Sequence, residues 1–140
     1  MIPEVAVGAV IVHDGRILLI RRAEPPSQGR WSVPGGRVLA GETLHEAVVR
    51  EVTEETGLEV LVVDFLGWVE RIDSETDTHF VILDFAAQPA DPDLAPHAAT
   101  DAADARWFDL DELDGLDLVD NLLDFLMDTG VVERTRTFEL

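Results

Sequence analysis

Residues 36–58 of this chain read GRVLAGETLHEAVVREVTEETGL. Glu51, Glu54 and Glu55 lie three and four positions apart in this stretch, a spacing that places side chains on one face of a helix. Because like charges in contact repel, three carboxylates on one face favour a bound cation, and Mg²⁺ and Mn²⁺ prefer carboxylate oxygens. The alternative is an acidic face turned to water. Such faces lie opposite the apolar stripe, whereas these acids continue it.

The pattern predicts a helix that begins after Thr43 and ends at Gly57. Thr43 and Glu46 form a capping box, and Gly57 fits the left-handed position that terminates a helix. The apolar stripe of the first turns comprises Leu44, Ala47, Val48 and Val52. This stripe runs into Glu51 and Glu55, so we expect a helix that lies on a sheet with its C-terminal half at a cleft.

The same stretch resembles the Nudix box, and the chain is identified as a member of the Nudix hydrolase family, of the MutT-like or ADP-ribose pyrophosphatase-like kind. The residues that carry the resemblance are Gly36, Glu42, Arg50, Glu51, Val52, Glu54, Glu55, Gly57 and Leu58. Residues 31–36 and 105–113 also resemble the family. The resemblance implies an α/β/α sandwich with a mixed β-sheet between helices, and Mg²⁺-dependent (or Mn²⁺-dependent) hydrolysis of a nucleoside diphosphate linked to a group X.

The resemblance also implies roles for individual residues. It makes Glu54 and Glu55 the principal metal ligands, and it makes Glu51 either a further ligand or the general base. Arg50 would orient Glu51, and Arg50, Glu51 and Glu55 form the expected catalytic set. The other residues with implied roles are Gly35, whose carbonyl completes the metal shell, Glu42, which supports the site, and Asp101, a further acidic ligand or simply a surface residue.

Several other side chains are candidates for substrate binding. Arg22, Arg30 and Arg37 flank the glycine-rich segment and are expected to hold the diphosphate, although strand alternation turns Arg21 and Arg22 to opposite faces. His79 either lines the cleft or is a hydrogen-bonded strand histidine. Trp31 is expected to pack in the core, which leaves Trp68 and Phe80 as candidates for stacking on a base.

The substrate class stays open between two enzyme readings. A nucleotide-sugar or ADP-ribose type substrate is favoured, because segments 28–38 and 78–83 resemble GDP-mannose hydrolases. Ser74, however, stands where many ADP-ribose hydrolases have proline. The alternative is a MutT-like enzyme that releases pyrophosphate from nucleoside triphosphates, including oxidised ones. The absence of tyrosine excludes the residue linked with dinucleoside polyphosphates. A binding or regulatory module is disfavoured because the acidic box is intact.

Composition bounds the remaining possibilities. The 140 residues suit one domain, expected over 1–130, with a tail of uncertain structure over 131–140. The net charge of −19 disfavours a nucleic-acid polymer as partner.

Cysteine is absent, which excludes disulfides and thiol catalysis. No apolar run is of membrane-spanning length and no signal peptide is recognisable, so we expect a cytoplasmic protein without a membrane partner. A homodimer through the tail remains open beside a frayed terminus.

Apolar periodicity and turn residues predict the remaining elements. Strands are expected over 5–12, 16–22, 30–34, 58–66, 67–71, 79–87 and 106–108, with turns at 13–15 and 73–77 and loops over 23–29 and 88–99. Gly35 and Gly36 are expected to release the backbone toward the helix. A second helix is expected after Asp117, ending near Gly130. This order predicts a mixed sheet between helices.

Overall fold

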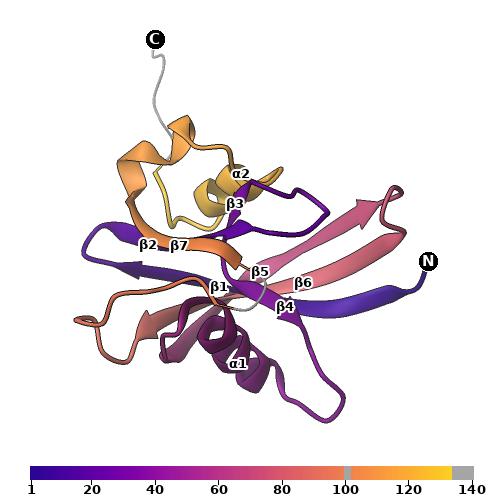
Figure 1. Ribbon diagram of the computed structural model, residues 1–140, viewed down its shortest axis with the longest axis horizontal. Coiled ribbons are helices and arrows are strands. Elements are labelled where there is room, and N and C mark those ends of the chain that lie inside the picture. Colours follow the sequence, from indigo (N-terminus) through magenta and orange to yellow (C-terminus); the bar gives the residue numbers. More distant parts are fainter. Residues whose placement is uncertain (100–101, 134–140) are drawn as a thin grey trace.

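The computed structural model describes residues 1–99 and 102–133. Its elements are β1 (Pro3–His13), β2 (Arg16–Arg22), β3 (Trp31–Ser32), β4 (Gly35–Arg37), α1 (Leu44–Thr56), β5 (Val60–Asp73), β6 (Thr78–Pro89), β7 (Ala102–Asp109), the 3₁₀ helix η1 (Leu110–Gly115) and α2 (Leu122–Asp128). The expected α/β architecture is confirmed. Figure 1 shows α1 below the strands and α2 above them.

The sheet is mixed, as predicted. Its strands run in the order β3-β2-β1-β6-β5, while β4 pairs with β1 and β7 pairs with β2. The β1–β6 pair is parallel and the other pairs are antiparallel. Asp14 and Gly15 have φ of 52° and 72°, which is the Asp-Gly hairpin turn expected between β1 and β2.

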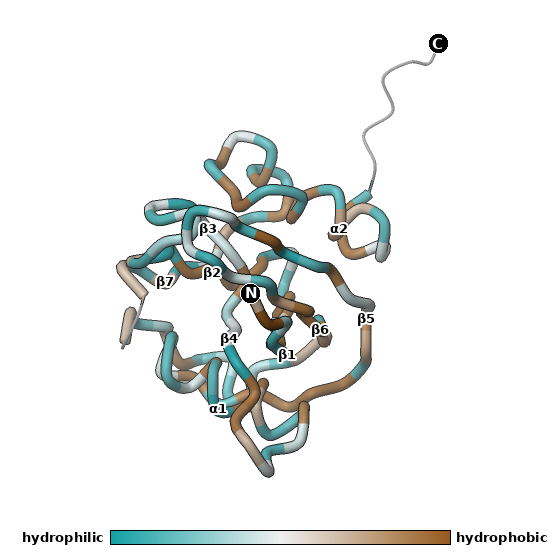
Figure 2. Tube along the Cα trace, turned by 90° about the vertical axis from the view of Figure 1, so that its right-hand side faces the viewer, coloured by the Kyte–Doolittle hydropathy of each residue, from teal (hydrophilic) through white to brown (hydrophobic). Residues whose placement is uncertain are grey.

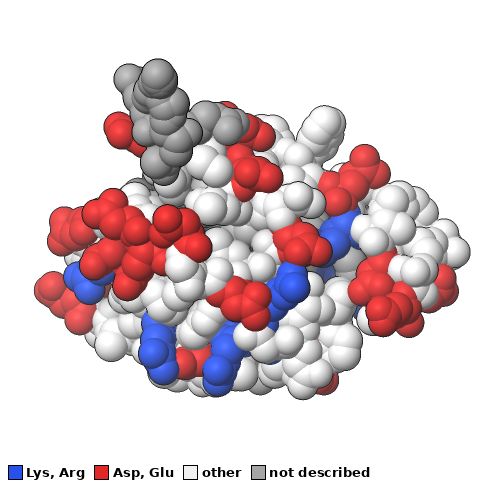
Figure 3. Space-filling model, turned by 90° about the horizontal axis from the view of Figure 1, so that it is seen from above, with Lys and Arg blue, Asp and Glu red and all other residues white. Residues whose placement is uncertain are grey.

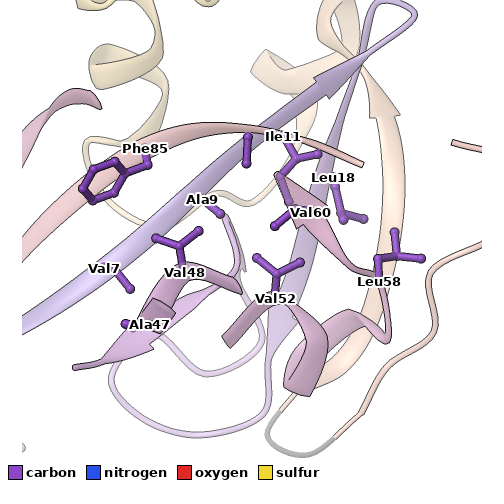
Figure 4. Packing of buried hydrophobic residues seen from close by; sticks show 11 residues of the cluster. Val7, Ala9, Ile11, Leu18, Ala47, Val48, Val52, Leu58, Val60 and Phe85 are labelled. Atoms are coloured by element: carbon purple, nitrogen blue, oxygen red, sulfur yellow. The ribbon is translucent and has the colours of Figure 1, made fainter. Parts of the chain in front are cut away.

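Two apolar cores lie on opposite faces of the sheet. On the lower face, which α1 covers, Val7, Ala9 and Phe85 pack against Val48 and Val52 (Figure 4). On the upper face, which α2 and η1 cover, the core contains Val10, Ile17, Leu19, Leu113, Val119, Leu122 and Leu126. Figure 2 shows hydrophobic segments at the centre of the molecule, between α1 and α2. The sheet therefore lies between helices, as the α/β/α prediction requires.

The segment before α1 corrects one prediction. A strand was expected over 30–34, followed by a free backbone at Gly35 and Gly36, but β3 covers only Trp31 and Ser32. Gly35 and Gly36 instead form β4 with Arg37, paired with Gly8, Val7 and Ala6 of β1. A Cβ atom on Gly35 would collide with the β1 backbone, so glycine is what lets this strand approach β1.

The remaining differences lie in the second half of the chain. The two strands expected over 58–66 and 67–71 are one strand, β5, because irregularities at 62–64 and 65–67 bend the strand without ending it. The last strand is longer than 106–108, since seven residues of β2 pair with β7. The second helix begins at Leu122 rather than after Asp117, because η1 and a left-handed Asn121 (φ 69°) precede it.

The tail is described only in part. Val131 and Val132 pack against the upper core, and their N–H groups donate to the Leu126 carbonyl at 2.9 and 3.1 Å. Residues 134–140, including Phe138, lie outside the described part. Among the residues that the structure describes, no helix is long and apolar enough to span a membrane.

Candidate active site

Helix α1 carries the predicted acids, and both of its predicted ends are confirmed. The Thr43 hydroxyl accepts from the Glu46 N–H at 3.1 Å, and the Glu46 carboxylate accepts from the Thr43 N–H at 2.9 Å. Gly57 has φ 76°, and its N–H donates to the Thr53 carbonyl at 2.9 Å. Ala47, Val48 and Val52 are buried on the sheet side together with Glu55 and Thr56. The two capped ends and the buried side fix the position of α1, and therefore of its acidic side chains, relative to β4.

Two of these acids touch the glycines of β4. The Glu55 side chain accepts the Gly35 N–H at 2.8 Å, and Glu55 as a residue is only 9% exposed. The Glu51 carboxylate lies so close to Gly36 that a Cβ atom there would collide with it. Gly36 therefore makes room for a carboxylate, and Gly35 supplies a donor that fixes one. Residues from the two halves of the box meet here, although the sequence separates them by 15 to 20 positions.

Arg50 links the acids to the start of the helix. Its guanidinium makes a bidentate pair with Glu42, with Nε–Oε2 and Nη2–Oε1 distances of 2.6 and 3.0 Å. It also donates to Glu54 at 3.0 Å, to Glu51 at 3.3 Å and to the Arg37 carbonyl at 2.9 Å. The five N–H donors of the guanidinium supply these five hydrogen bonds, whereas a lysine ammonium has only three donors.

The Glu42–Arg50 pair is a fixed ion pair. The hydrogen bond from Arg50 lowers the pKa of Glu42, and the Leu39 N–H, which Glu42 also accepts at 3.0 Å, lowers it further. Reciprocally, Glu42 raises the pKa of Arg50, with smaller contributions from the charges of Glu51 and Glu54. Both groups therefore stay charged across the range in which proteins work.

The donor set fits a hard divalent cation. Within residues 1–99 and 102–133, no three His, Asp or Glu side chains are already arranged to hold a metal ion. Glu51 and Glu54 instead converge on the Arg50 guanidinium, which shows that this space accommodates positive charge. Glu55 and the Gly35 backbone adjoin it and add oxygen donors of the type Mg²⁺ prefers. Asp101, the further expected ligand, lies outside the described residues.

The predicted substrate arginines are spread over the upper face. Arg30 forms an ion pair with Asp120 at 2.7 Å, and Arg22 donates to the Pro26 carbonyl at 2.6 Å. The Arg37 guanidinium lies 5.6 Å from the centre of the Phe80 ring. Figure 3 shows arginine side chains across an otherwise acidic and neutral upper surface. Among the three, only Arg37 contacts the acid network directly, through its carbonyl.

The aromatic and histidine predictions can now be placed. Trp31 packs against Phe108 at 4.8 Å beside the upper core, as predicted, whereas Trp68 is 63% exposed. His79 is hydrogen-bonded to Glu70 at 3.1 Å. Alternation along β6 turns His79 to the lower face and Phe80 to the upper face, where Arg37 lies. A role for His79 in substrate binding stays a prediction.

Sequence reasoning missed two charged residues of the upper face, Arg71 and Asp84. Asp84 is 5% exposed, and burial raises its pKa to about 7, an effect that nearby Arg71 partly offsets. Burial and the neighbouring Arg22 lower the pKa of Arg71. A single aspartate inside an apolar strand was the available signal, since such residues are rarely buried without a reason.

Comparison with known proteins gives the family. The family model for the NUDIX domain matches residues 2–127. An ADP-ribose pyrophosphatase of Methanocaldococcus jannaschii is 41% identical over 111 residues, covering 79% of this chain and 64% of that protein. A putative 8-oxo-dGTP diphosphatase 2 of Mycobacterium tuberculosis is 46% identical over 61 residues, covering 43% of each chain. The chain thus spans less than two thirds of the length of both of these curated relatives.

A solved structure agrees over nearly its whole length. The MutT NUDIX hydrolase from Burkholderia pseudomallei superposes with a TM-score of 0.79 at 34% identity, covering 90% of this chain and 97% of that one. The agreement extends over both faces of the sheet and is not confined to the helix that carries the acids. On the strength of the family model and these relatives, the chain belongs to the NUDIX domain family.

Proposed function

We propose that this chain is a Mg²⁺-dependent hydrolase that cleaves the diphosphate of a nucleoside diphosphate linked to a group X, of nucleotide-sugar or ADP-ribose type. The observation that carries the proposal is the meeting of Glu51 and Glu55 with the glycines of β4, next to Glu54, which Arg50 joins to Glu51 and Glu42. The name of the archaeal relative, an ADP-ribose pyrophosphatase, supports this substrate type.

Each residue has a task in this reaction. Glu51, Glu54, Glu55 and the Gly35 carbonyl would hold Mg²⁺, which when bound polarises a phosphoryl oxygen and lowers the pKa of water. Arg50 keeps Glu51 in place, and the Gly35 N–H keeps Glu55 in place. The water oxygen bonds to phosphorus while the bridging P–O bond breaks. The two products are a nucleoside monophosphate and phosphorylated X.

Glu51 has two candidate roles, metal ligand or general base. As the base, its carboxylate takes the proton of the attacking water, so Glu51→Gln lowers kcat and removes the acidic limb of the pH–rate profile. As a ligand only, the same substitution raises the Mg²⁺ concentration needed for half-maximal rate and keeps that limb. Initial rates measured across pH and Mg²⁺ concentration separate the two roles.

A nucleoside triphosphate pyrophosphohydrolase is the second candidate. The identity to the 8-oxo-dGTP diphosphatase, which is confined to 61 residues, favours it. The two candidates differ in their products. Pyrophosphate released from a triphosphate identifies the second, whereas two monophosphoryl products from ADP-ribose or a nucleotide sugar identify the first.

The test is a panel of nucleotides incubated with the wild type, Glu55→Gln and Glu75→Gln in Mg²⁺. Glu55→Gln should retain the fold and lose about 100-fold or more in kcat, because Glu55 is held at the β4 glycines. Glu75→Gln, an exposed change of the same kind in the β5–β6 turn, should be neutral. Equal rates for the wild type and Glu55→Gln, or no hydrolysis of any nucleotide by the wild type, would refute the proposal.

A further inference from the structure

Asp84 is a buried carboxyl group for which the proposed reaction has no use. It lies in β6 opposite Gly8 of β1 on one side and Gly67 of β5 on the other. A carboxylate oxygen of Asp84 lies where a Cβ atom of Gly8 would be, next to a methyl group of Val33. Although Asp84 is only 5% exposed, no hydrogen bond or ion pair reaches its carboxyl group from residues 1–99 or 102–133. Buried polar groups are normally satisfied, so this one needs an explanation.

The carboxyl group lies on the upper face of the sheet. Val7, Ala9 and Phe85, the neighbours of Gly8 and Asp84 along their strands, belong to the lower core. Alternation therefore turns Asp84 to the face that α2 covers. Gly67 confirms this side, because a Cβ atom on it would meet the Phe125 ring of α2 at 3.5 Å. Asp84 is thus flanked by a glycine on each neighbouring strand, Gly8 of β1 and Gly67 of β5.

The nearest opposing charge is not a bonded partner. Arg71 of β5 lies close enough to lower the pKa of Asp84, yet no ion pair joins the two within the described chain. Among the residues that the structure describes, Arg71 donates only a long hydrogen bond, 3.5 Å, to the Asp120 carbonyl, and it is repelled by Arg22. A group that accepts from Arg71 and donates to Asp84 would satisfy both side chains.

The position of Asp84 suits the organic part of a substrate. Gly35, beside the candidate metal ligands, pairs with Gly8, which pairs with Asp84. Two strand spacings separate their backbones by about 10 Å, roughly the distance from a diphosphate to the far end of an attached ribose or base. Phe80, which pairs with Arg71 across β5 and β6, presents its ring under Arg37 on the same face.

We propose that the Asp84 carboxyl group determines specificity by accepting hydrogen bonds from two adjacent donors on the organic part of the substrate, with Arg71 donating to the neighbouring acceptor. The proposal rests on the proposed function for the position of the diphosphate. Two sources supply such a donor pair. The vicinal hydroxyls of a ribose are one, and the ring N–H and amino group of guanine are the other.

The experiment measures binding and uses two pairs of probes that each differ by one donor. GDP and IDP differ by the amino group of guanine, and ADP and 2′-deoxy-ADP differ by one ribose hydroxyl. Titration calorimetry in Mg²⁺ compares the wild type, Asp84→Asn and Asp93→Asn. Asp93 is an exposed loop residue, so Asp93→Asn is a control with the same charge change. Thermal melts check that each variant is folded.

We expect the wild type to prefer the donor-bearing probe of one pair by about 10- to 100-fold, the range for a lost hydrogen bond to a charged group. Asp84→Asn should remove that preference and Asp93→Asn should keep it. Equal binding within both pairs by the wild type, or binding of none of the four probes, overturns the proposal even if Asp84→Asn fails to fold. An unchanged preference in Asp84→Asn overturns it as well.

The outcomes separate this inference from the proposed function. If hydrolysis depends on Glu55 but the wild type does not prefer the donor-bearing probe of either pair, only the role of Asp84 is refuted. Donor-selective binding that depends on Asp84, without hydrolysis of any nucleotide, sinks the proposed function alone.

Discussion

At the scale of single residues, the candidate site depends on close approach. Gly36 faces the Glu51 carboxylate, and Gly35 both approaches β1 and donates to Glu55. Arg50 binds Glu42 at one end and Glu51 and Glu54 at the other. The orientation of each carboxylate is thus set by a donor on another residue. Small substitutions at these positions should therefore lower kcat more than they lower the free energy of unfolding.

Gly36→Ala tests this dependence. The new methyl group would meet the end of the Glu51 side chain first, and that end can move, so the fold should survive while the carboxylate is displaced. We expect kcat to fall by roughly 100-fold, the usual effect of displacing a catalytic group by about 1 Å. The control is Gly115→Ala, where a Cβ atom meets nothing within 4 Å. Steady-state rates and melting curves measure both variants, and full activity in Gly36→Ala would contradict the prediction.

Asp84 predicts a pH dependence of stability. Burial raises the pKa of this carboxyl group from 3.8 to about 7, so the folded state keeps the proton to higher pH than the unfolded state does. Its contribution to the free energy of unfolding therefore falls as pH rises between about 4 and 7, by roughly 4 kcal/mol at most. Asp84→Asn lacks this loss.

Urea unfolding of the wild type and Asp84→Asn measures the effect at about pH 5 and about pH 8. The variant should gain stability relative to the wild type on going to the higher pH. Subtracting the two proteins removes the contributions of the other titrating groups. A difference between them that does not change with pH would show that Asp84 ionises normally.

At the scale of elements, α1 is fastened at both ends. A capping box holds its start, and Gly57 ends it in a left-handed conformation. The loop after β6 closes over that end, with the His97 N–H donating to the Thr56 carbonyl at 2.9 Å and the Ala99 N–H to the Glu55 carbonyl at 3.2 Å. This loop thus connects β6 to β7 past the last turn of α1, which carries Glu54 and Glu55.

Gly57→Ala should destabilise the protein for two separable reasons. An alanine at φ 76° costs roughly 1–2 kcal/mol, and its methyl group would also collide with the His97 ring. His97→Ala removes only the collision, so Gly57→Ala should cost less free energy of unfolding in that background. A double-mutant cycle by urea unfolding measures the coupling. Strict additivity would show that His97 does not pack on Gly57.

At the scale of the whole molecule, the protein combines one sheet and two apolar cores with a net charge of −19. Arginines are the only strongly basic residues, and Figure 3 shows several of them on the upper face. The many acidic side chains repel one another, which destabilises the compact state. Their combined negative field also repels anionic substrates. In the proposed function, a bound Mg²⁺ together with the arginines would reverse the sign of the charge locally.

Salt and Mg²⁺ should therefore stabilise the protein for different reasons. Raising NaCl from about 0.05 M to about 1 M screens the acidic surface and should raise the melting temperature. Millimolar Mg²⁺ at matched ionic strength should raise it further by binding the folded state. The extra shift should shrink in Glu55→Gln. No difference between Mg²⁺ and NaCl at equal ionic strength would argue against the metal site.

Several features of this protein could be predicted from short stretches of its sequence. The capping residues and Gly57 fixed α1, because their hydrogen bonds and φ values involve only near neighbours. The Asp14–Gly15 turn and the spacing of Glu51, Glu54 and Glu55 are equally local. The resemblance carried by the same box led to the family, which the comparison with known proteins confirms.

Only the tertiary structure decided what depends on distant partners. β4 exists because Gly35 and Gly36 lie against β1, and β7 extends beyond its short aromatic segment because β2 pairs with it. The Gly35–Glu55 hydrogen bond and the burial of Asp84 between Gly8 and Gly67 join segments of several strands and a helix. Propensity and periodicity describe near neighbours along the chain, whereas desolvation and close approach are set by packing that only the folded chain creates.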